Sequence, residues 1–181
     1  MIVIDGFLSN YNELKEYSKT AVFKEEVNDV DGAVYPAICL DVPESIRGSV
    51  IDGIQKTKGY KINVNLMFLR ANPKGSREPY QAHNDLNMGS NTFILYLKDS
   101  GGTAFVEHIN TGMNKNDHSL IDVWLQDCNV KDAWCVTDLI NMEENRALFF
   151  NAEMMHRGEP VEGYGEGNDA RMILVCFYDK A

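Results

Sequence analysis

The chain has 181 residues, of which 44% are hydrophobic and 24% are charged, a composition typical of one globular domain spanning residues 1–181. Its 27 acidic and 17 basic side chains give a formal net charge of -10, which repels phosphate groups and argues against nucleic acid as a partner. No apolar stretch reaches the length of a membrane-spanning helix, and the first ten residues lack the basic region of a signal peptide, so we expect a cytoplasmic protein without a membrane partner.

The first 60 residues predict a short strand and then two helices that support the rest of the domain. MIVIDGFLSN is typical of a first strand. A helix is expected at about residues 11–21, with Asn10 as its N-cap. A second helix is expected in ESIRGSVIDGIQKTK, and Gly59 can end it. Its buried face is predicted by apolar residues at four-residue spacing, namely Ile46, Val50 and Ile54.

Residues 61–181 predict a β-rich core. Five segments have the composition of strands: 61–72, 92–98, 103–108, 146–150 and 171–178. Gly101 and Gly102 predict a turn between the second and third of these, so we expect those two strands to form a hairpin. The stretch 109–141 is predicted to be an insertion. It begins as a polar loop and ends in VKDAWCVTDLI, which fits either a helix or a strand.

The last predicted strand is apolar on both of its alternating faces. One face carries Ile173, Val175 and Phe177, and the other carries Met172, Leu174, Cys176 and Tyr178. A strand of this kind is covered on both sides. Helices that lead into many short strands therefore predict an α+β fold built on a sandwich or barrel.

The four cysteines show neither a CxxC pair nor the spacing of a zinc ribbon. We expect reduced and mostly buried thiols, as in other cytoplasmic proteins. A disulfide between Cys128 and Cys135 stays open on spacing alone.

Two residues of YQAHNDLN can bind one metal ion together. His83 and Asp85 are two positions apart, and on an extended chain such positions project from the same face. His156 follows a predicted strand and can supply a third ligand from far along the chain. Two imidazoles and one carboxylate leave one face of an octahedral metal open, the arrangement of non-haem Fe(II) oxygenases. An HxD motif alone also fits a surface hairpin with a local hydrogen bond.

Arg171 begins the doubly apolar last strand, on the face of Ile173 and Val175. A guanidinium in such surroundings is costly unless an anion pairs with it. The sequence leaves three outcomes open. The partner is an acidic residue of the protein, or the side chain extends to water at the rim, or the guanidinium fork grips a small carboxylate ligand.

The order of these motifs resembles the 2-oxoglutarate/Fe(II)-dependent oxygenases, and specifically their prolyl-hydroxylase-like branch. The resemblance covers about residues 60–180 and rests on four segments, which are HND, FILYLKDSGGTAF, NRALFFNAEMMHRGEPV and RMILVCFYD. It implies a double-stranded β-helix, the cupin-like jelly-roll, at about residues 61–181. The N-terminal helices, within about residues 1–60, would pack on one of its sheets.

The resemblance also assigns roles to individual residues. The iron ligands would be His83, Asp85 and His156, and Arg171 would bind the distal carboxylate of 2-oxoglutarate with help from the hydroxyl of Tyr96. Tyr80, three residues before the first histidine, would line the pocket. Tyr96 fits a core aromatic residue equally well.

Two departures from the family pattern concern Arg171. It lies farther beyond His156 than is usual, behind a Gly-rich loop that we expect to close a hairpin. Ile173 stands where many family members have a serine, so the role of Tyr96 becomes more necessary.

The implied activity is 2-oxoglutarate- and Fe(II)-dependent hydroxylation of an amino-acid side chain, free or in a peptide, with release of succinate and carbon dioxide and with ascorbate as a candidate reductant. Two alternatives stay open: a cupin-like barrel that binds a metal or small ligand without oxygenase activity, and a non-catalytic interaction domain with the same fold. The acidic loop 157–169 suggests a cationic substrate or is a solvated hairpin tip. His108 and His118 fit no metal-ligand spacing, and the sequence predicts no oligomeric state.

Overall fold

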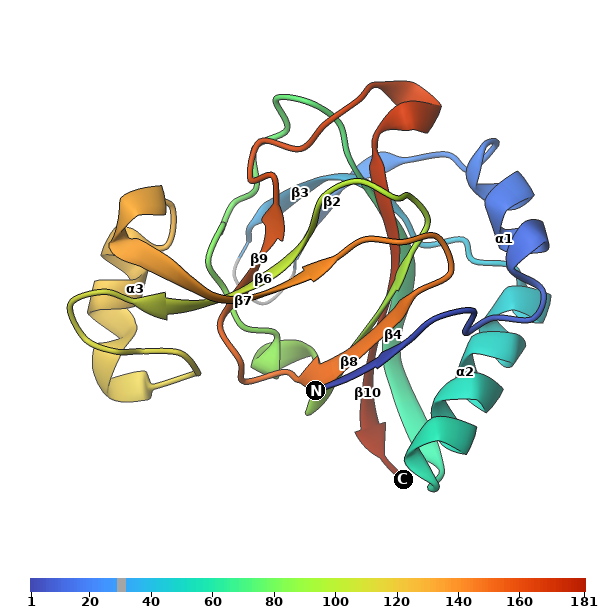
Figure 1. Ribbon diagram of the computed structural model, residues 1–181, viewed down its shortest axis with the longest axis horizontal. Coiled ribbons are helices and arrows are strands. Elements are labelled where there is room, and N and C mark those ends of the chain that lie inside the picture. Colours follow the sequence, from blue (N-terminus) through green and yellow to red (C-terminus); the bar gives the residue numbers. More distant parts are fainter. Residues whose placement is uncertain (29–31) are drawn as a thin grey trace.

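The computed structural model describes residues 1–28 and 32–181, and the strands in this part of the chain form two antiparallel sheets (Figure 1). The larger sheet has the order β1-β8-β5-β10-β4-β3-β2. Its strands are β1 Ile2–Ile4, β2 Lys24–Val27, β3 Val34–Cys39, β4 Ile62–Asn72, β5 Asn91–Tyr96, β8 Ala147–Asn151 and β10 Arg171–Lys180. The smaller sheet has the order β7-β6-β9, with β6 Gly102–His108, β7 Trp134–Asn141 and β9 His156–Glu159.

Beyond β5 the chain passes back and forth between the two sheets. Strands β5, β8 and β10 belong to the larger sheet, whereas β6, β7 and β9 belong to the smaller one. This alternation is the winding of a double-stranded β-helix, so the expected α+β jelly-roll fold is confirmed.

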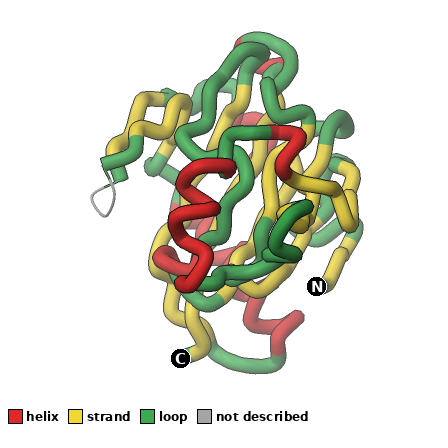
Figure 2. Tube along the Cα trace, turned by 90° about the vertical axis from the view of Figure 1, so that its left-hand side faces the viewer, coloured by secondary structure: helices red, strands yellow, loops and turns green. Residues whose placement is uncertain are grey.

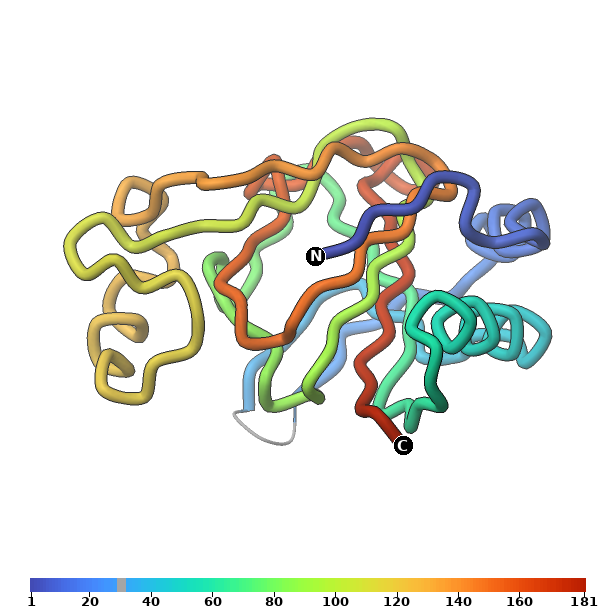
Figure 3. The backbone as a smooth tube through the Cα atoms, turned by 60° about the horizontal axis from the view of Figure 1, so that its bottom comes forward, coloured from blue at the N-terminus to red at the C-terminus, as the bar shows by residue number. Residues whose placement is uncertain are grey.

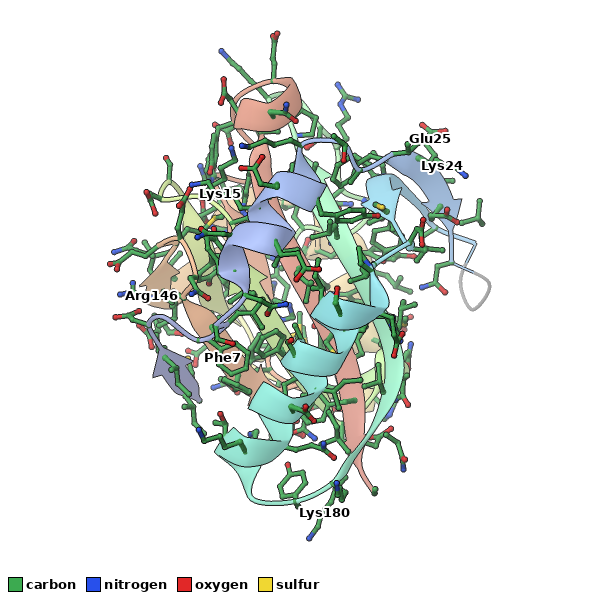
Figure 4. All side chains as sticks on the ribbon, turned by 90° about the vertical axis from the view of Figure 1, so that its right-hand side faces the viewer. Phe7, Lys15, Lys24, Glu25, Arg146 and Lys180 are labelled. Atoms are coloured by element: carbon green, nitrogen blue, oxygen red, sulfur yellow. The ribbon has the colours of Figure 1, made fainter. Side chains whose placement is uncertain are left out.

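Two helices, α1 Tyr11–Ser18 and α2 Glu44–Lys58, cover the outer face of the larger sheet (Figures 1 and 4). The predicted buried face of α2 is confirmed, because Ile46, Val50 and Ile54 are fully buried against the sheet. The helix ends at Gly59 in the left-handed conformation, as predicted.

Helix α2 is tied to the chain that follows β1 by one close contact. The ring of Phe7, labelled in Figure 4, lies against Gly53 of α2, where a Cβ atom would come within 2.6 Å of the ring. The same ring packs on Phe93 and Phe149 of the sheet, at centroid distances of 5.1 and 5.6 Å. A glycine inside a helix costs stability, and here it allows the close approach.

Strand β10 has the two-sided burial that its sequence predicts. Its even-numbered residues from Met172 to Tyr178 face the helices, and Ile173, Val175 and Phe177 face the space between the sheets. Arg171 shares the parity of the second set, so it too points between the sheets.

The two hairpins predicted at Gly101-Gly102 and at the Gly-rich loop before Arg171 do not form, so both predictions are wrong. Strand β5 pairs with β8 and β10, while β6 pairs with β7 and β9, so the turn at Gly101 leads from one sheet to the other. The loop after β9 crosses between the sheets in the same way and reaches β10, which pairs with β4 and β5. Turn residues mark where a strand ends and leave its partner undetermined.

The stretch 109–141 is an insertion only in its first part. Helix α3 Ile121–Asp127 lies in an arm, residues 108–133, that projects beyond the sheets, facing the viewer in Figure 2 and on the left in Figure 3. The ambiguous segment 130–140 contains most of β7, an edge strand of the smaller sheet. Short 3-10 turns complete the fold: Leu86–Met88, His118–Leu120, Lys131–Ala133 and Gly167–Asp169.

Local details near the N-terminus also differ from expectation. Helix α1 ends at Ser18, and Asn10 forms no capping hydrogen bond with its side chain; its amide nitrogen donates to Glu13 instead, at 3.0 Å. Strands β2 and β3 were not predicted.

All four cysteines are free thiols and three are buried, so Cys128 and Cys135 form no disulfide. No helix within the described residues is long and apolar enough to span a membrane.

Candidate metal centre and its two pockets

The three predicted metal ligands come together between the sheets. The ligand atoms of His83, Asp85 and His156 all lie within 4.8 Å of one another. Nε2 of His83 is 3.7 Å from one carboxylate oxygen of Asp85, and Nε2 of His156 is 3.3 Å from the other. The surface-hairpin interpretation of the HxD motif is wrong, since Asp85 is buried and the backbone of His83 pairs with that of the distant His156.

Backbone hydrogen bonds place these residues side by side. The amide of His83 donates to the carbonyl of His156 at 3.0 Å, and the amide of His156 donates back at 2.8 Å. The amide of Asp85 donates to the carbonyl of Ala152 at 2.8 Å. His83 and Asp85 are thereby hydrogen-bonded through their backbone to the segment that leads into β9 and to its first residue. These backbone bonds alone bring His156 next to the other two ligands.

Further hydrogen bonds orient the ligand atoms toward a common centre. Nδ1 of His83 donates to the carbonyl of Gln81, and Nδ1 of His156 donates to the carbonyl of Met154, both at 2.9 Å. This tautomer leaves both Nε2 lone pairs free for a metal. The hydroxyl of Thr92 donates to Asp85 at 2.8 Å and fixes the carboxylate.

The charges in the centre suit metal binding. Burial of the ring, together with the neighbouring His156, lowers the pKa of His83 to about 4, so this imidazole is neutral at physiological pH. Burial raises the pKa of Asp85, but the interactions with His156, His83 and the Thr92 hydroxyl together outweigh that effect and lower the pKa to about 2. Neutral imidazole and ionised carboxylate are the protonation states that bind metals.

A narrow pocket of about 70 Å³ leads from these ligands to Arg171. The part of its wall beyond the metal ligands includes Asn72 of β4, Thr103 of β6, Gly158 of β9 and Ile173 of β10. The guanidinium carbon of Arg171 lies 3.4 Å from where a Cβ atom of Gly158 would stand, so glycine keeps this end open.

Arg171 is buried without a carboxylate partner among the described residues. Its Nη1 donates to Oδ1 of Asn72 at 3.0 Å, and its Nη2 donates to the carbonyl of Gly102 at 3.1 Å. Its Nε has no hydrogen-bond partner, and burial lowers the pKa of the guanidinium. A buried cation with only neutral partners and one unused donor fits an anionic ligand. Of the three outcomes that the sequence left open, neither an internal acid nor the solvent-exposed rim applies.

The two tyrosines singled out by the sequence lie at different ends of the site. Tyr96 is fully buried and is not part of the pocket wall; its hydroxyl donates to Oγ1 of Thr103 at 2.9 Å, and Thr103 lines the pocket. Its role in binding a carboxylate stays a prediction. Tyr80 lines the pocket as expected, and its ring packs against Trp124 of α3 with centroids 5.1 Å apart.

Next to the metal ligands a much wider cleft opens, with a volume of about 950 Å³. The strands β2 and β3 form one side of it, and the segment that includes α3 forms the other. His83, Asp85 and Tyr80 line both the narrow pocket and the wide cleft. The candidate metal centre therefore lies where two chemically different spaces meet.

The other two histidines lie away from the metal ligands. His108 is buried in the arm, where its ring nitrogens contact Asp127 at 3.1 Å and Thr111 at 2.9 Å. His118 is exposed at the edge of the wide cleft. The side chains of the acidic loop, Glu159, Glu162, Glu166 and Asp169, do not line the wide cleft.

In sequence comparisons no family model matches the chain, and no curated protein matches it. Comparison with solved structures does find similar proteins. The non-heme alpha ketoglutarate dependent carbocyclase SnoK from nogalamycin biosynthesis matches with a TM-score of 0.62 and 17% identity over 98% of this chain and 78% of SnoK. HygX from Streptomyces hygroscopicus, solved with nickel and 2-oxoglutarate bound, matches with a TM-score of 0.57 and 12% identity over 98% of this chain and 81% of HygX.

A third structure, EctD from S. alaskensis with bound Fe, matches with a TM-score of 0.55 and 13% identity over 99% of this chain and 72% of EctD. The likeness is one of fold. Identities this low show a shared architecture, and function has to be argued from the site itself.

Sequence reasoning missed part of the site wall. Arg70 lines both spaces, and its guanidinium pairs with Glu78, which also accepts a hydrogen bond from Asn72. A signal for two of these residues was present: in β4, Arg70 and Asn72 have the same parity as Phe68, so an arginine and an asparagine fall on a face that enters the core. Glu78 lies in a turn-rich segment and carries no such signal.

Proposed function

We propose that this protein is a 2-oxoglutarate- and Fe(II)-dependent dioxygenase in which His83, Asp85 and His156 bind the metal and Arg171 binds the distal carboxylate of the co-substrate. In the overall reaction a substrate C–H group, dioxygen and 2-oxoglutarate give the hydroxylated substrate, succinate and carbon dioxide. The observation that carries the proposal is the pairing of one metal site with one buried, unmatched guanidinium in the same narrow pocket.

The donor set fits iron. Two imidazoles and one carboxylate provide three ligands and leave the remaining positions of an octahedral ion open, which suits a non-haem Fe(II) site that must also bind other ligands. HygX with nickel and 2-oxoglutarate bound, and EctD with bound Fe, have the same fold and support this assignment.

The far end of the narrow pocket fits a small dicarboxylate. Arg171 brings a buried positive charge and an unused Nε donor, and Gly158 leaves room beside it. Thr103 lines the same end and has Tyr96 behind it, so the predicted contribution of Tyr96 would pass through the Thr103 hydroxyl. An arginine fork is a common anchor for a carboxylate.

When bound, the metal would activate dioxygen, the oxidant, with two electrons from the decarboxylation of 2-oxoglutarate, and so make it able to break an unactivated C–H bond. The protein's own contribution is to hold and shield the reactants. The Nδ1 hydrogen bonds of both histidines and the Thr92 bond keep the ligand atoms in place. Ile94, Ile173 and Val175 form an apolar wall that limits water near the centre.

Hydroxylation of an amino-acid side chain, and membership of the prolyl-hydroxylase-like branch, are the finer parts of the proposal. They are supported by the order of the sequence motifs around His83, His156 and Arg171. The alternative of a cupin-like metal-binding barrel explains the three metal ligands equally well. It gives no function to a buried guanidinium that has no carboxylate partner among the described residues, and for this reason we favour the oxygenase.

The test is spectroscopic. Anaerobic addition of Fe(II) and 2-oxoglutarate to the full chain should give a weak visible charge-transfer band that neither component gives alone. The variants His83→Ala and His156→Ala should lose it. In air, the loaded protein should form succinate slowly even without substrate. A barrel that only binds metal would give neither the band nor succinate, and this result would reject the proposal.

A further inference from the structure

From the wide cleft we infer a substrate class: a bulky molecule with an apolar face and with hydroxyl or amino groups, neutral or cationic, in which any carboxyl or phosphate group is absent or blocked. This inference rests on the proposed function, because it takes the cleft to be the place where a substrate reaches the metal centre.

The size of the cleft argues for a bulky substrate. Its volume of about 950 Å³ lies at the upper end of the range of roughly 300–1,000 Å³ that is typical of pockets for drug-sized ligands. A free amino acid would occupy little of it. Substrate specificity would then depend on contacts over a large area rather than on a tight cavity at the metal.

The floor of the cleft is apolar and largely aromatic. It includes Phe68 and Phe177 from the core, Met113 and Met155 near the metal ligands, and Tyr80 and Trp124 at the arm. The two aromatic rings last named pack against each other, so they form a fixed wall. Such surfaces bind rings or alkyl groups by apolar contact and can stack on a cation.

The rim of the cleft is rich in acceptors and negative charge. Glu26 of β2, Asp117 in the arm and Asp179 at the end of β10 come from three separate elements. Hydrogen bonds from Asn65 and Ser90 lower the pKa of Asp179, and those from Ser119 lower the pKa of Asp117. Carboxylate and amide oxygens accept hydrogen bonds from hydroxyl and ammonium groups.

Positive charge is almost absent from the same surface. Among the described residues that line the cleft, Arg70 is the one lysine or arginine. Its guanidinium pairs with Glu78 and stacks over the ring of Tyr35 at 5.4 Å. Within this described lining, an anionic substrate would therefore meet three rim carboxylates and no free lysine or arginine, which disfavours its binding.

The narrow pocket has the opposite polarity. Arg70, Arg157 and Arg171 line it, and the acids among its described lining residues are Glu78 and the metal-centre residue Asp85. Two ligands that approach one metal through these two spaces would thus be sorted by charge. The dianionic co-substrate is attracted to the arginines of the narrow pocket, and the carboxylates of the cleft keep it from entering through the cleft.

The test uses three probes that share a naphthalene ring: 2-(1-naphthyl)ethylammonium, 2-(1-naphthyl)ethanol and 1-naphthaleneacetate. Their binding to the full chain is measured by equilibrium dialysis at low ionic strength, with excess 2-oxoglutarate present to keep the carboxylate probe out of the narrow pocket. We expect the ammonium probe to bind about tenfold more tightly than the carboxylate probe, with the alcohol between them.

Two matched double variants test whether the carboxylates of the cleft cause the preference for the ammonium probe. The double variant Glu26→Gln/Asp117→Asn should remove most of the preference for the ammonium probe. The side-chain amide oxygen introduced at position 117 can still accept the hydrogen bond that Ser119 donates to Asp117 in the native chain, at 2.9 Å. The control Glu162→Gln/Glu166→Gln removes the same charge from the acidic loop, outside the cleft, and should leave the preference unchanged.

Equal binding of the three probes, tighter binding of the carboxylate, no binding at all, or a preference lost only in the control variant would each overturn the inference. The visible band with Fe(II) and 2-oxoglutarate, measured on the same preparation, separates the two claims. A band without a probe preference rejects the substrate class alone, and a probe preference without a band rejects the proposed oxygenase alone.

Discussion

The narrow pocket and the wide cleft share two of the candidate metal ligands, His83 and Asp85, but differ in size and in charge. The pocket is small, and its key charge, on Arg171, is buried and has no ion-pair partner among the described residues; the cleft is large, and its charges lie near solvent at the rim. A buried charge binds a small ligand strongly and with fixed geometry, whereas exposed charges select among ligands weakly. Under the proposed function, the pocket would therefore be a demanding co-substrate site and the cleft an adaptable substrate site.

The largest expected effect comes from removing one of the three candidate metal ligands. His156→Ala should abolish metal binding, and with it all succinate formation, because only two protein ligands would remain. Metal content after dialysis, measured by atomic absorption, checks this. His118→Ala is the histidine control, and we expect it to retain the metal. Stoichiometric iron in a folded His156→Ala protein would show that the metal is bound elsewhere.

A smaller loss is expected when only the narrow pocket is changed. Arg171→Met should weaken 2-oxoglutarate binding by roughly 30-fold to several thousandfold, from the 2–5 kcal/mol typical of a lost buried charge partner. The affinity for Fe(II) alone should not change. Titration of the visible band gives both constants.

The chain offers a matched control in the same pocket. Arg157 is also buried, but its guanidinium already pairs with Glu159 at 2.8 Å. Arg157→Met should therefore weaken 2-oxoglutarate binding far less than Arg171→Met. Equal losses in the two variants would mean that the pocket recognises only its total charge, and that the unpaired guanidinium has no special role.

Loss of a supporting hydrogen bond should weaken the metal centre without removing a ligand. Thr92→Val deletes the hydroxyl that donates to Asp85, and we expect about a tenfold loss of metal affinity. The control Thr137→Val removes a strand hydroxyl that donates to the carbonyl of Phe105 instead. Competition with a coloured chelator measures both. An unchanged affinity in Thr92→Val would show that backbone contacts alone orient the carboxylate.

The smallest expected effect is a difference between the two spaces in how strongly salt weakens ligand binding. Raising the ionic strength from about 0.05 to 0.5 M should reduce the preference of the cleft for the ammonium probe several-fold, because its carboxylates lie near solvent and are screened. Binding of 2-oxoglutarate at the buried Arg171 should fall less. The reverse order would contradict the assignment of buried and exposed charge to the two spaces.

Much of the candidate site could be predicted because its chemistry is local in the sequence. His83 and Asp85 are two residues apart, and the apolar alternation of β10 is enough to predict that Arg171 lies on a buried face. Helix α2 was predicted for the same reason, since four-residue spacing specifies a buried helix face.

Features that depend on pairing between distant segments could not be predicted in this way. The alternation in residues 92–108 shows two strands, but nothing in it shows that they belong to different sheets. Strand β2, with the sequence KEEV, has mostly exposed charged residues, and its structure comes from pairing with β3. The Arg70–Glu78 ion pair joins a strand to a turn-rich segment, so it too became visible only in three dimensions.

Anomalous diffraction at the iron edge would test the central claim most directly, on crystals grown without oxygen in the presence of Fe(II) and 2-oxoglutarate. We predict one iron peak among the ligand atoms of His83, Asp85 and His156, with the keto acid extending into the narrow pocket and its distal carboxylate on Arg171. An iron peak elsewhere, or a keto acid lying in the wide cleft, would contradict the account.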